Sequence, residues 1–155
     1  MSILAPSILI TDDDLAFRKT LQTVFEPQGF RTLTAGDGEE AVEIVRKEEV
    51  HLVLLDMHMP KLTGVETIRQ LKLVKAALPC ILMSARLDEW IVEQARIVRA
   101  FSVLAKPMSR REVTGVVRLA LERTYNWRLD KLCPPPRPTG YQDTSSPEAF
   151  ADFAN

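Results

Sequence analysis

The chain has 155 residues, 46% of them hydrophobic, which is enough to bury one sizeable core and leaves little room for a second domain. Its formal net charge is −1 with both signs interspersed, so it lacks the basic field that carries non-specific nucleic-acid binding. The N-terminus lacks the pattern of a signal peptide, and no apolar run approaches the roughly 20 residues that span a bilayer. Composition therefore predicts a cytoplasmic domain that neither binds DNA directly nor enters a membrane.

The two cysteines carry no metal or redox motif. Cys80 lies in an apolar run and Cys133 precedes three prolines, with no CxxC or Cys/His spacing. This usage fits a reducing compartment, with Cys80 in the core and Cys133 without a role.

Short apolar runs bounded by turn residues alternate along the chain with longer stretches of helical period. This alternation is typical of a parallel sheet with crossover helices. The predicted strands are Ser7 to Thr11, Phe30 to Ala35, His51 to Leu55, Cys80 to Ser84 and Phe101 to Ala105.

Apolar residues recur at helical spacing between these strands. The four stripes are Phe17, Leu21, Val24 and Phe25, then Ala41, Ile44 and Val45, then Val65, Ile68 and Leu71, then Leu87, Ile91, Ala95 and Val98. A fifth helix follows Ser109, whose spacing from Glu112 fits a capping box. Five strand–helix units predict an α/β fold of the flavodoxin-like, doubly wound type, with a five-stranded parallel sheet in the order 2-1-3-4-5 and five helices.

The composition changes after Leu129, where a proline-rich segment begins. We interpret residues 1–129 as the folded domain and residues 130–155 as a flexible tail.

Chemically active residues follow four of the predicted strands. Asp12, Asp13 and Asp14 follow the first strand, and Asp56 follows the third. Ser84 ends the fourth strand, and Lys106-Pro107 follows the fifth. Because sites in doubly wound sheets form at the carboxyl ends of the strands, we expect these side chains to meet at one edge.

Each of these residues alone has an ordinary explanation. Asp14, or Asp12 taken alone, fits an N-cap of the next helix as well as it fits a ligand. Lys106 alone fits a solvated lysine, and Ser84 alone fits a turn residue. Only their joint placement indicates a site.

Clustered carboxylates in a chain without a local basic excess repel one another unless a cation neutralises them. A hard divalent ion suits oxygen ligands, so the sequence predicts Mg²⁺, or Mn²⁺ in its place. A carboxylate beside that ion can attack phosphorus and hold an acyl phosphate. The metal, a lysine and a hydroxyl can then stabilise the phosphoryl oxygens, and Asp56, Lys106 and Ser84 fill these roles.

The segments SILITDDD, LVLLDMHMPKLTG, ILMSA and LAKP resemble, in order and spacing, the motifs of response regulator receiver domains (CheY-like) of two-component signal transduction. The resemblance covers about residues 5–125. It implies a single-domain phosphoacceptor switch and not an enzyme, beyond self-catalysed phosphotransfer and autodephosphorylation. The implied donor is a histidine kinase or a histidine phosphotransfer protein.

The resemblance also implies a role for each site residue. Asp56 is the phosphoacceptor and a metal ligand, Asp13 a direct ligand, and Asp12 a ligand through water. The backbone carbonyl of His58 is the third protein contact to the metal, while its imidazole faces solvent. Met59-Pro60 and Gly64 shape the loop after the acceptor strand.

The phosphoryl-binding and switch residues follow from the same resemblance. Ser84 is the switch hydroxyl, and Ala85 is the small residue that leaves the pocket open to the donor. Lys106 is the salt-bridging lysine, and its bond to Pro107 is often cis in this family.

One position departs from the family pattern. The aromatic residue usually found three residues before the lysine is replaced by Val103. Phe101 is expected on the same strand face as Val103. It lies about 6.6 Å away along the strand, which is too far for its ring to replace the missing aromatic without rearrangement. Phosphorylation is therefore expected to be read out differently or more weakly.

Two positions tune the lifetime of the phosphoryl group in such domains, here His58 and Arg86. We hypothesise that Arg86 contacts the phosphoryl group and hinders the attacking water. A solvated surface arginine is the equal alternative.

The output surface in receiver domains is usually the fourth helix, fifth strand and fifth helix. Trp90 and Ile97 are expected to be partly exposed there, although a Trp at the edge of the core is the commoner case and is slightly favoured. Five arginines make the last helix basic, which fits an acidic partner or a solvated face.

Two alternatives compete with a phosphorylated switch. A haloacid-dehalogenase-type phosphatase would use Asp12 as nucleophile, but Ala16 stands where that family has Thr or Val and Asp56 is unexplained. A receiver-type scaffold that works without phosphorylation is supported only by Val103.

Overall fold

The computed structural model describes residues 5–129, and the predicted tail lies outside the described residues. Five parallel strands form one sheet in the order β2-β1-β3-β4-β5, which confirms the predicted fold class. The strands are β1 (Ser7–Thr11), β2 (Arg31–Ala35), β3 (Leu52–Asp56), β4 (Cys80–Ser84) and β5 (Ser102–Ala105). β1 and β4 have the predicted bounds, while β2, β3 and β5 begin one residue later than predicted.

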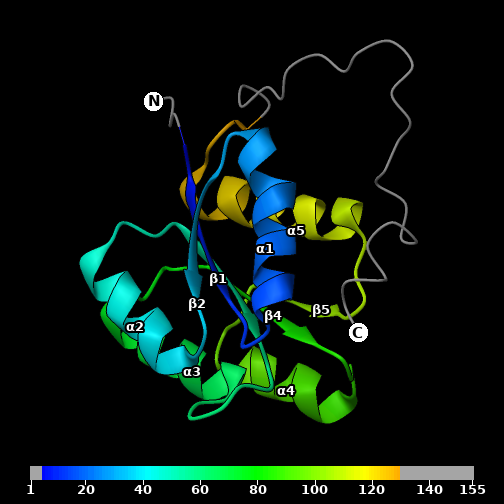
Figure 1. Cartoon of the computed structure of the whole chain (residues 1–155). Helices are drawn as coiled ribbons and strands as arrows, with labels where there is room; N and C mark the ends of the chain where they lie inside the picture. Colours follow the sequence, from blue (N-terminus) through cyan, green and yellow to red (C-terminus); the bar gives the residue numbers. More distant parts are fainter. Residues whose placement is uncertain (1–4, 130–155) are drawn as a thin grey trace.

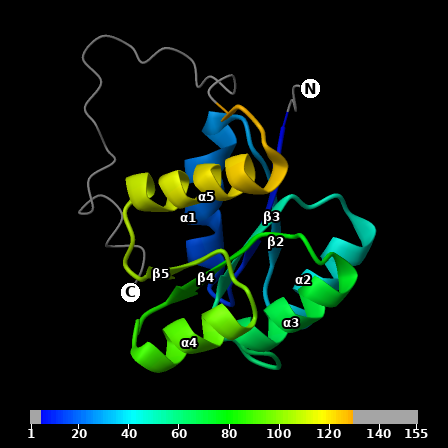
Figure 2. The ribbon, with the colours of Figure 1, turned by 180° about the vertical axis from the view of Figure 1, so that it is seen from behind.

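Five α-helices cover the two faces of the sheet (Figures 1 and 2). They are α1 (Leu15–Phe25), α2 (Gly38–Lys47), α3 (Gly64–Val74), α4 (Glu89–Ile97) and α5 (Arg110–Tyr125), with a short 3-10 helix at Glu26–Gln28 after α1. α1 and α5 lie on one face, and α2, α3 and α4 lie on the other.

Each α-helix begins at a residue whose side chain accepts a backbone N–H of the first turn. These N-caps are Asp14, Asp37, Thr63, Asp88 and Ser109. Ser109 and Glu112 form the predicted capping box. The caps fix where each helix starts, and therefore the length of each loop at the carboxyl edge of the sheet.

The core consists of two apolar layers, one on each side of the sheet. Ile8 and Ile10 of β1 pack toward α1 and α5, while Leu9 packs toward the layer of α2, α3 and α4. The alternation follows from the two-residue period of a strand. The predicted stripes are correct except at Leu87, which precedes α4 and is 49% exposed. Cys80 is buried as predicted, and burial raises the pKa of its thiol to about 12.

No helix within residues 5–129 is long and apolar enough to cross a bilayer.

Candidate functional site

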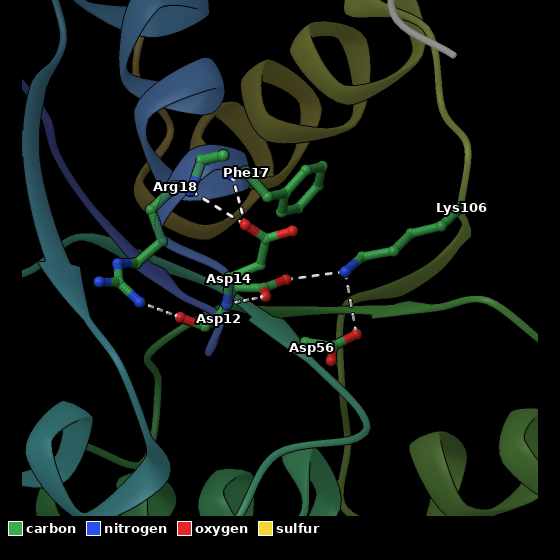
Figure 3. Close-up of polar contacts among 7 residues, drawn as sticks. Asp12, Asp14, Phe17, Arg18, Asp56 and Lys106 are labelled. Atoms are coloured by element: carbon green, nitrogen blue, oxygen red, sulfur yellow. Dashed lines mark hydrogen bonds and ion pairs between the residues drawn. The ribbon is translucent and has the colours of Figure 1, made fainter. Parts of the chain in front are cut away.

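The predicted site residues meet at the carboxyl edge of the sheet, as their positions after the strands require. Asp12 follows β1, Asp56 ends β3, Ser84 ends β4 and Lys106 follows β5. Figure 3 shows the Lys106 side chain reaching Asp12 and Asp56, with a dashed line to each.

Three carboxylates form the centre of the site. One oxygen from each of Asp12, Asp13 and Asp56 lies within 4.8 Å of the others. Asp12 and Asp56 are buried, whereas Asp13 is exposed. This acidic group can therefore be reached from solvent on the Asp13 side.

Lys106 is the cation of the site. Its Nζ lies 2.7 Å from Asp12 Oδ2 and 3.2 Å from Asp56 Oδ1. The same ammonium sits 4.2 Å from the centre of the Phe17 ring, a distance typical of a cation–π contact. The lysine is thus held on three sides and partly neutralises the carboxylates.

Burial shifts the titration of this pair. Burial raises the pKa of the Asp56 carboxyl above its ordinary value of 3.8. The charge of Lys106 opposes this shift, whereas the charges of Asp12 and Asp13 add to it. For Lys106, burial lowers the pKa, but the hydrogen bond and charge of Asp12, with Asp56, outweigh it and raise the pKa above 10.5. Lys106 is therefore charged at neutral pH.

Asp56 is expected to cost stability at neutral pH in the absence of a metal. Because its folded-state pKa is raised, the fold prefers the protonated form, and that stability is lost as pH rises through the raised pKa. We expect Asp56→Asn to stabilise the metal-free protein near pH 7, because the asparagine amide is neutral and does not bury a charge beside Asp12 and Asp13. The gain should shrink as pH falls toward 3.8, which urea unfolding across this window would measure. Equal stability of the two proteins at pH 7 would contradict the prediction.

Asp14 does not belong to the acidic group. Its Oδ1 accepts the backbone N–H groups of Ala16, at 2.9 Å, and Phe17, at 3.2 Å. The open choice between a helix cap and a site residue is thereby decided for both aspartates, because Asp14 caps α1 and Asp12 binds Lys106 in the site.

The Ser84 hydroxyl is engaged in its own loop. It donates to the carbonyl of Arg86 at 2.7 Å and accepts the Arg86 N–H at 3.2 Å. Ser84 is buried, while Ala85 and the side chain of Arg86 are exposed. The hydroxyl would have to leave these two bonds before it could bind a group on Asp56.

The loop between β3 and α3 places His58 at the surface beside Asp56. Its side chain is exposed, as predicted. Gly64 closes the loop, since its N–H donates to the carbonyl of Met57 at 2.8 Å. The bond between Lys106 and Pro107 is cis.

The expectation that Phe101 shares a strand face with Val103 is wrong. β5 begins at Ser102, so Phe101 precedes the strand and packs against the layer of α1 and α5. Val103 packs against the opposite layer, with α2, α3 and α4. Phe101 therefore cannot replace the missing aromatic by a shift along the strand.

The interpretation of Trp90 as a core-edge residue is also wrong. Trp90 is 60% exposed and Ile97 is 50% exposed. Residues advance by about 100° along a helix, so Val92 lies on the opposite flank of α4 from Trp90 and Ile97. With a right-handed connection from β4 to β5, the Val92 flank lies toward β5 and the Trp90 flank faces away from it.

Two contacts of the site were missed by sequence reasoning. Phe17 was identified only as a core residue, and Arg18 was not singled out. Arg18 Nη1 donates to the backbone carbonyl of Asp12 (Figure 3). A side chain that bonds to a carbonyl leaves no recognisable signal in residue types or spacing.

The response regulator receiver domain family matches residues 8–118 of the chain. The chain is 34% identical over 117 residues to the alkaline phosphatase synthesis transcriptional regulatory protein PhoP of Bacillus subtilis, covering 76% of this chain and 49% of that protein. It is 33% identical over 111 residues to the sporulation initiation phosphotransferase F of the same organism, covering 72% of this chain and 90% of that protein. The chain thus spans about half of the first relative and most of the second.

Solved structures agree with this grouping. A CheY-like receiver domain protein from Methanospirillum hungatei gives a TM-score of 0.76 at 20% identity, covering 79% of this chain and 98% of that one, which shows the shared fold. The Francisella response regulator 1452 receiver domain gives a TM-score of 0.72 at 28% identity, covering 77% and 98%.

A flavodoxin-like sheet with an acidic group at its carboxyl edge defines the class of CheY-like signalling domains. The chain belongs to the response regulator receiver domain family of two-component systems. Members of this family generally act as signalling switches and not as enzymes.

The acidic group fits the magnesium ion that receiver domains typically bind. Its donors are hard carboxylate oxygens, and Mg²⁺ takes few protein oxygens and keeps several waters. Because Asp13 is exposed, those waters have room on the solvent side.

Proposed function

We propose that this protein is a phosphoacceptor switch whose Asp56 receives a phosphoryl group from a histidine kinase or a histidine phosphotransfer protein. The observation that carries the proposal is the meeting of Asp12, Asp13 and Asp56, two of which, Asp12 and Asp56, contact the ammonium of Lys106. Clustered carboxylates with one fixed cation suit a site for a divalent metal and a phosphoryl group.

The residues would share the work of phosphoryl transfer. An Asp56 carboxylate oxygen attacks phosphorus, and the bond from phosphorus to the donor histidine nitrogen breaks, so the electron pair leaves with the imidazole. Lys106 supplies positive charge to the phosphoryl oxygens, and Ser84 supplies a hydrogen bond once its hydroxyl leaves Arg86. The exposed Ala85 leaves the approach to Asp56 uncrowded.

Magnesium would neutralise the charge that develops on the phosphoryl oxygens. We assign its direct contacts to Asp13, Asp56 and the backbone carbonyl of His58, and a water-mediated contact to Asp12. The geometry supports this division, because Asp12 already binds Lys106 through Oδ2 and the N–H of Asp14 through Oδ1.

Intact mass spectrometry after incubation with acetyl phosphate and Mg²⁺ tests the proposal. We expect a gain of one phosphoryl group, lost in an Asp56→Asn variant and in EDTA. Asp14→Asn is the matched control, because it neutralises a carboxylate at the same edge and keeps a capping side chain. A folded wild-type protein that gains no mass would favour the phosphorylation-independent scaffold, which otherwise rests only on Val103.

The phosphatase alternative has little support. Both carboxylate oxygens of Asp12 are engaged, one with Lys106 and one with the N–H of Asp14. The nucleophile of such an enzyme would therefore be occupied by the protein itself. Asp56, by contrast, contacts Lys106 through Oδ1, and its Oδ2 has no hydrogen-bond partner among residues 5–129.

We also propose that Arg86 prolongs the phosphoryl lifetime, as one of the two tuning positions with His58. Its side chain is exposed, and its backbone N–H donates to the Ser84 hydroxyl, so the residue lies at the carboxyl edge of the sheet where the site forms. An Arg86→Ala variant should lose its phosphoryl group about threefold faster, the effect of one weak charge-assisted contact. Mass measured over time after removal of donor would show this, with Arg69→Ala as an exposed-arginine control. Unchanged decay would identify Arg86 as a solvated residue.

The downstream partner is proposed to bind the surface of α4, β5 and α5. Val92 and the partly buried Val103 lie on this side of the domain, and Val103 offers less bulk than an aromatic ring. The basic character of α5 supports an acidic partner only in part, because Arg118 binds Gln28 and the carbonyl of Leu129. We place the phosphoryl transfer and the binding of this partner in the cytoplasm.

A further inference from the structure

The proposed ligand Asp13 is held by its backbone. It is exposed, and its carboxylate has no hydrogen-bond partner among residues 5–129. The two peptide groups that flank the residue therefore set the direction of its Cα–Cβ bond, and with it the region that the carboxylate can reach. Whatever fixes those peptide groups decides whether Asp13 is ready for a metal.

The peptide group after Asp13 is fixed within the loop. The N–H of Asp14 donates to Asp12 Oδ1 at 2.9 Å. The Asp12 side chain is in turn held by Lys106 at 2.7 Å, and the Asp12 N–H donates to the carbonyl of Ala35 at 3.1 Å.

The peptide group before Asp13 is fixed by Arg18. Its Nη1 donates to the Asp12 carbonyl, which belongs to the peptide that links Asp12 to Asp13 (Figure 3). Arg18 itself is anchored in α1, where its N–H bonds to the carbonyl of Asp14 at 3.1 Å. The guanidinium passes beside Gly36, where a Cβ would lie 3.5 Å from Nη1.

We propose that Arg18 is a positioning residue for the metal site, acting through the Asp12 carbonyl on the direction of Asp13. The inference rests on the proposed function and deepens it. A charge-assisted bond from guanidinium to carbonyl restrains the peptide plane before Asp13, so the carboxylate does not lose this freedom when the metal binds.

Charge and positioning predict opposite effects of removing Arg18. As a nearby cation, Arg18 repels Mg²⁺, so its neutralisation would strengthen metal binding if charge were its only contribution. As a positioning residue, its loss weakens binding, because partners that orient metal ligands typically contribute tenfold or more to affinity. The sign of the change therefore separates the two roles.

The test is calorimetric titration of the full chain with Mg²⁺, comparing wild type with Arg18→Met. We expect the variant to bind about tenfold more weakly, and the Mg²⁺ concentration for half-maximal phosphorylation by acetyl phosphate to rise equally with an unchanged plateau rate. Lys19→Met, which removes an exposed charge one residue along α1, should change neither value by more than about twofold.

Equal or tighter Mg²⁺ binding by Arg18→Met would overturn the role of Arg18 and leave the proposed function intact. Arg18→Lys keeps the charge without the planar fork and is expected to bind more weakly than wild type as well, which provides a second test if the neutral variant does not fold. A wild-type protein that neither binds Mg²⁺ nor gains a phosphoryl group would overturn both proposals.

Discussion

A Gly64→Ala variant is expected to lose about 3 kcal/mol of folding free energy, although the change adds one methyl group. A Cβ at Gly64 would lie 2.6 Å from the carbonyl oxygen of Asp56 and 2.5 Å from Leu82 Cδ1. It would also lie 2.9 Å from the Cα of Met57. Two of these atoms belong to backbone, so α3 would have to move away from the end of β3.

Urea unfolding of the metal-free protein would measure this loss. Gly115→Ala is the matched control, because Gly115 is exposed within α5 and a Cβ there meets nothing within 4 Å. That change should stabilise the fold by about 0.5–1 kcal/mol. A Gly64→Ala protein as stable as wild type would show that α3 does not need this close approach to Asp56.

Replacing Lys106 with Met is expected to slow phosphoryl uptake from acetyl phosphate about 100-fold at saturating Mg²⁺. The ammonium is the cation bound to both Asp12 and Asp56, and the methionine stem can keep the packing against Phe17. The variant therefore removes the charge with little loss of apolar contact. Loss of Lys106 also removes an influence that lowers the pKa of Asp56.

The rate would be followed by intact mass in quenched samples. Lys47→Met removes an exposed ion pair with Glu43 on α2 and should leave the rate unchanged. A Lys106→Met rate within threefold of wild type would show that the metal alone stabilises the phosphoryl oxygens.

The fold was predictable because its signals are local. The short apolar run of β1 and the helical stripe of Phe17, Leu21 and Phe25 each identify an element without knowledge of its neighbours. The edge that holds the site was predictable for a related reason. The carboxyl ends of parallel strands share one edge, so Asp12, Asp56 and Lys106 had to come near one another.

Errors arose where a residue stands at the boundary of an element. Phe101 precedes β5 by one residue, and this shift places it on the opposite side of the sheet from Val103. Leu87 precedes α4 by two residues and lies at the surface. The hydrophobic period of a helix or strand predicts which way a side chain faces only for residues within that helix or strand.

The sequence by itself determined the fold class, the order of the elements and the acidic edge, because periodicity and the ends of parallel strands are properties of the chain read locally. Only the tertiary structure decided that Asp14 caps α1, that Lys106 lies between Asp12 and Asp56, and that Arg18 holds the Asp12 carbonyl. Lys106 and Asp12 are 94 residues apart in the chain, so only the packed sheet brings them together. The cap and the Arg18 contact are local, but several acceptors lie within reach there, and only the folded backbone decides which of them is bonded.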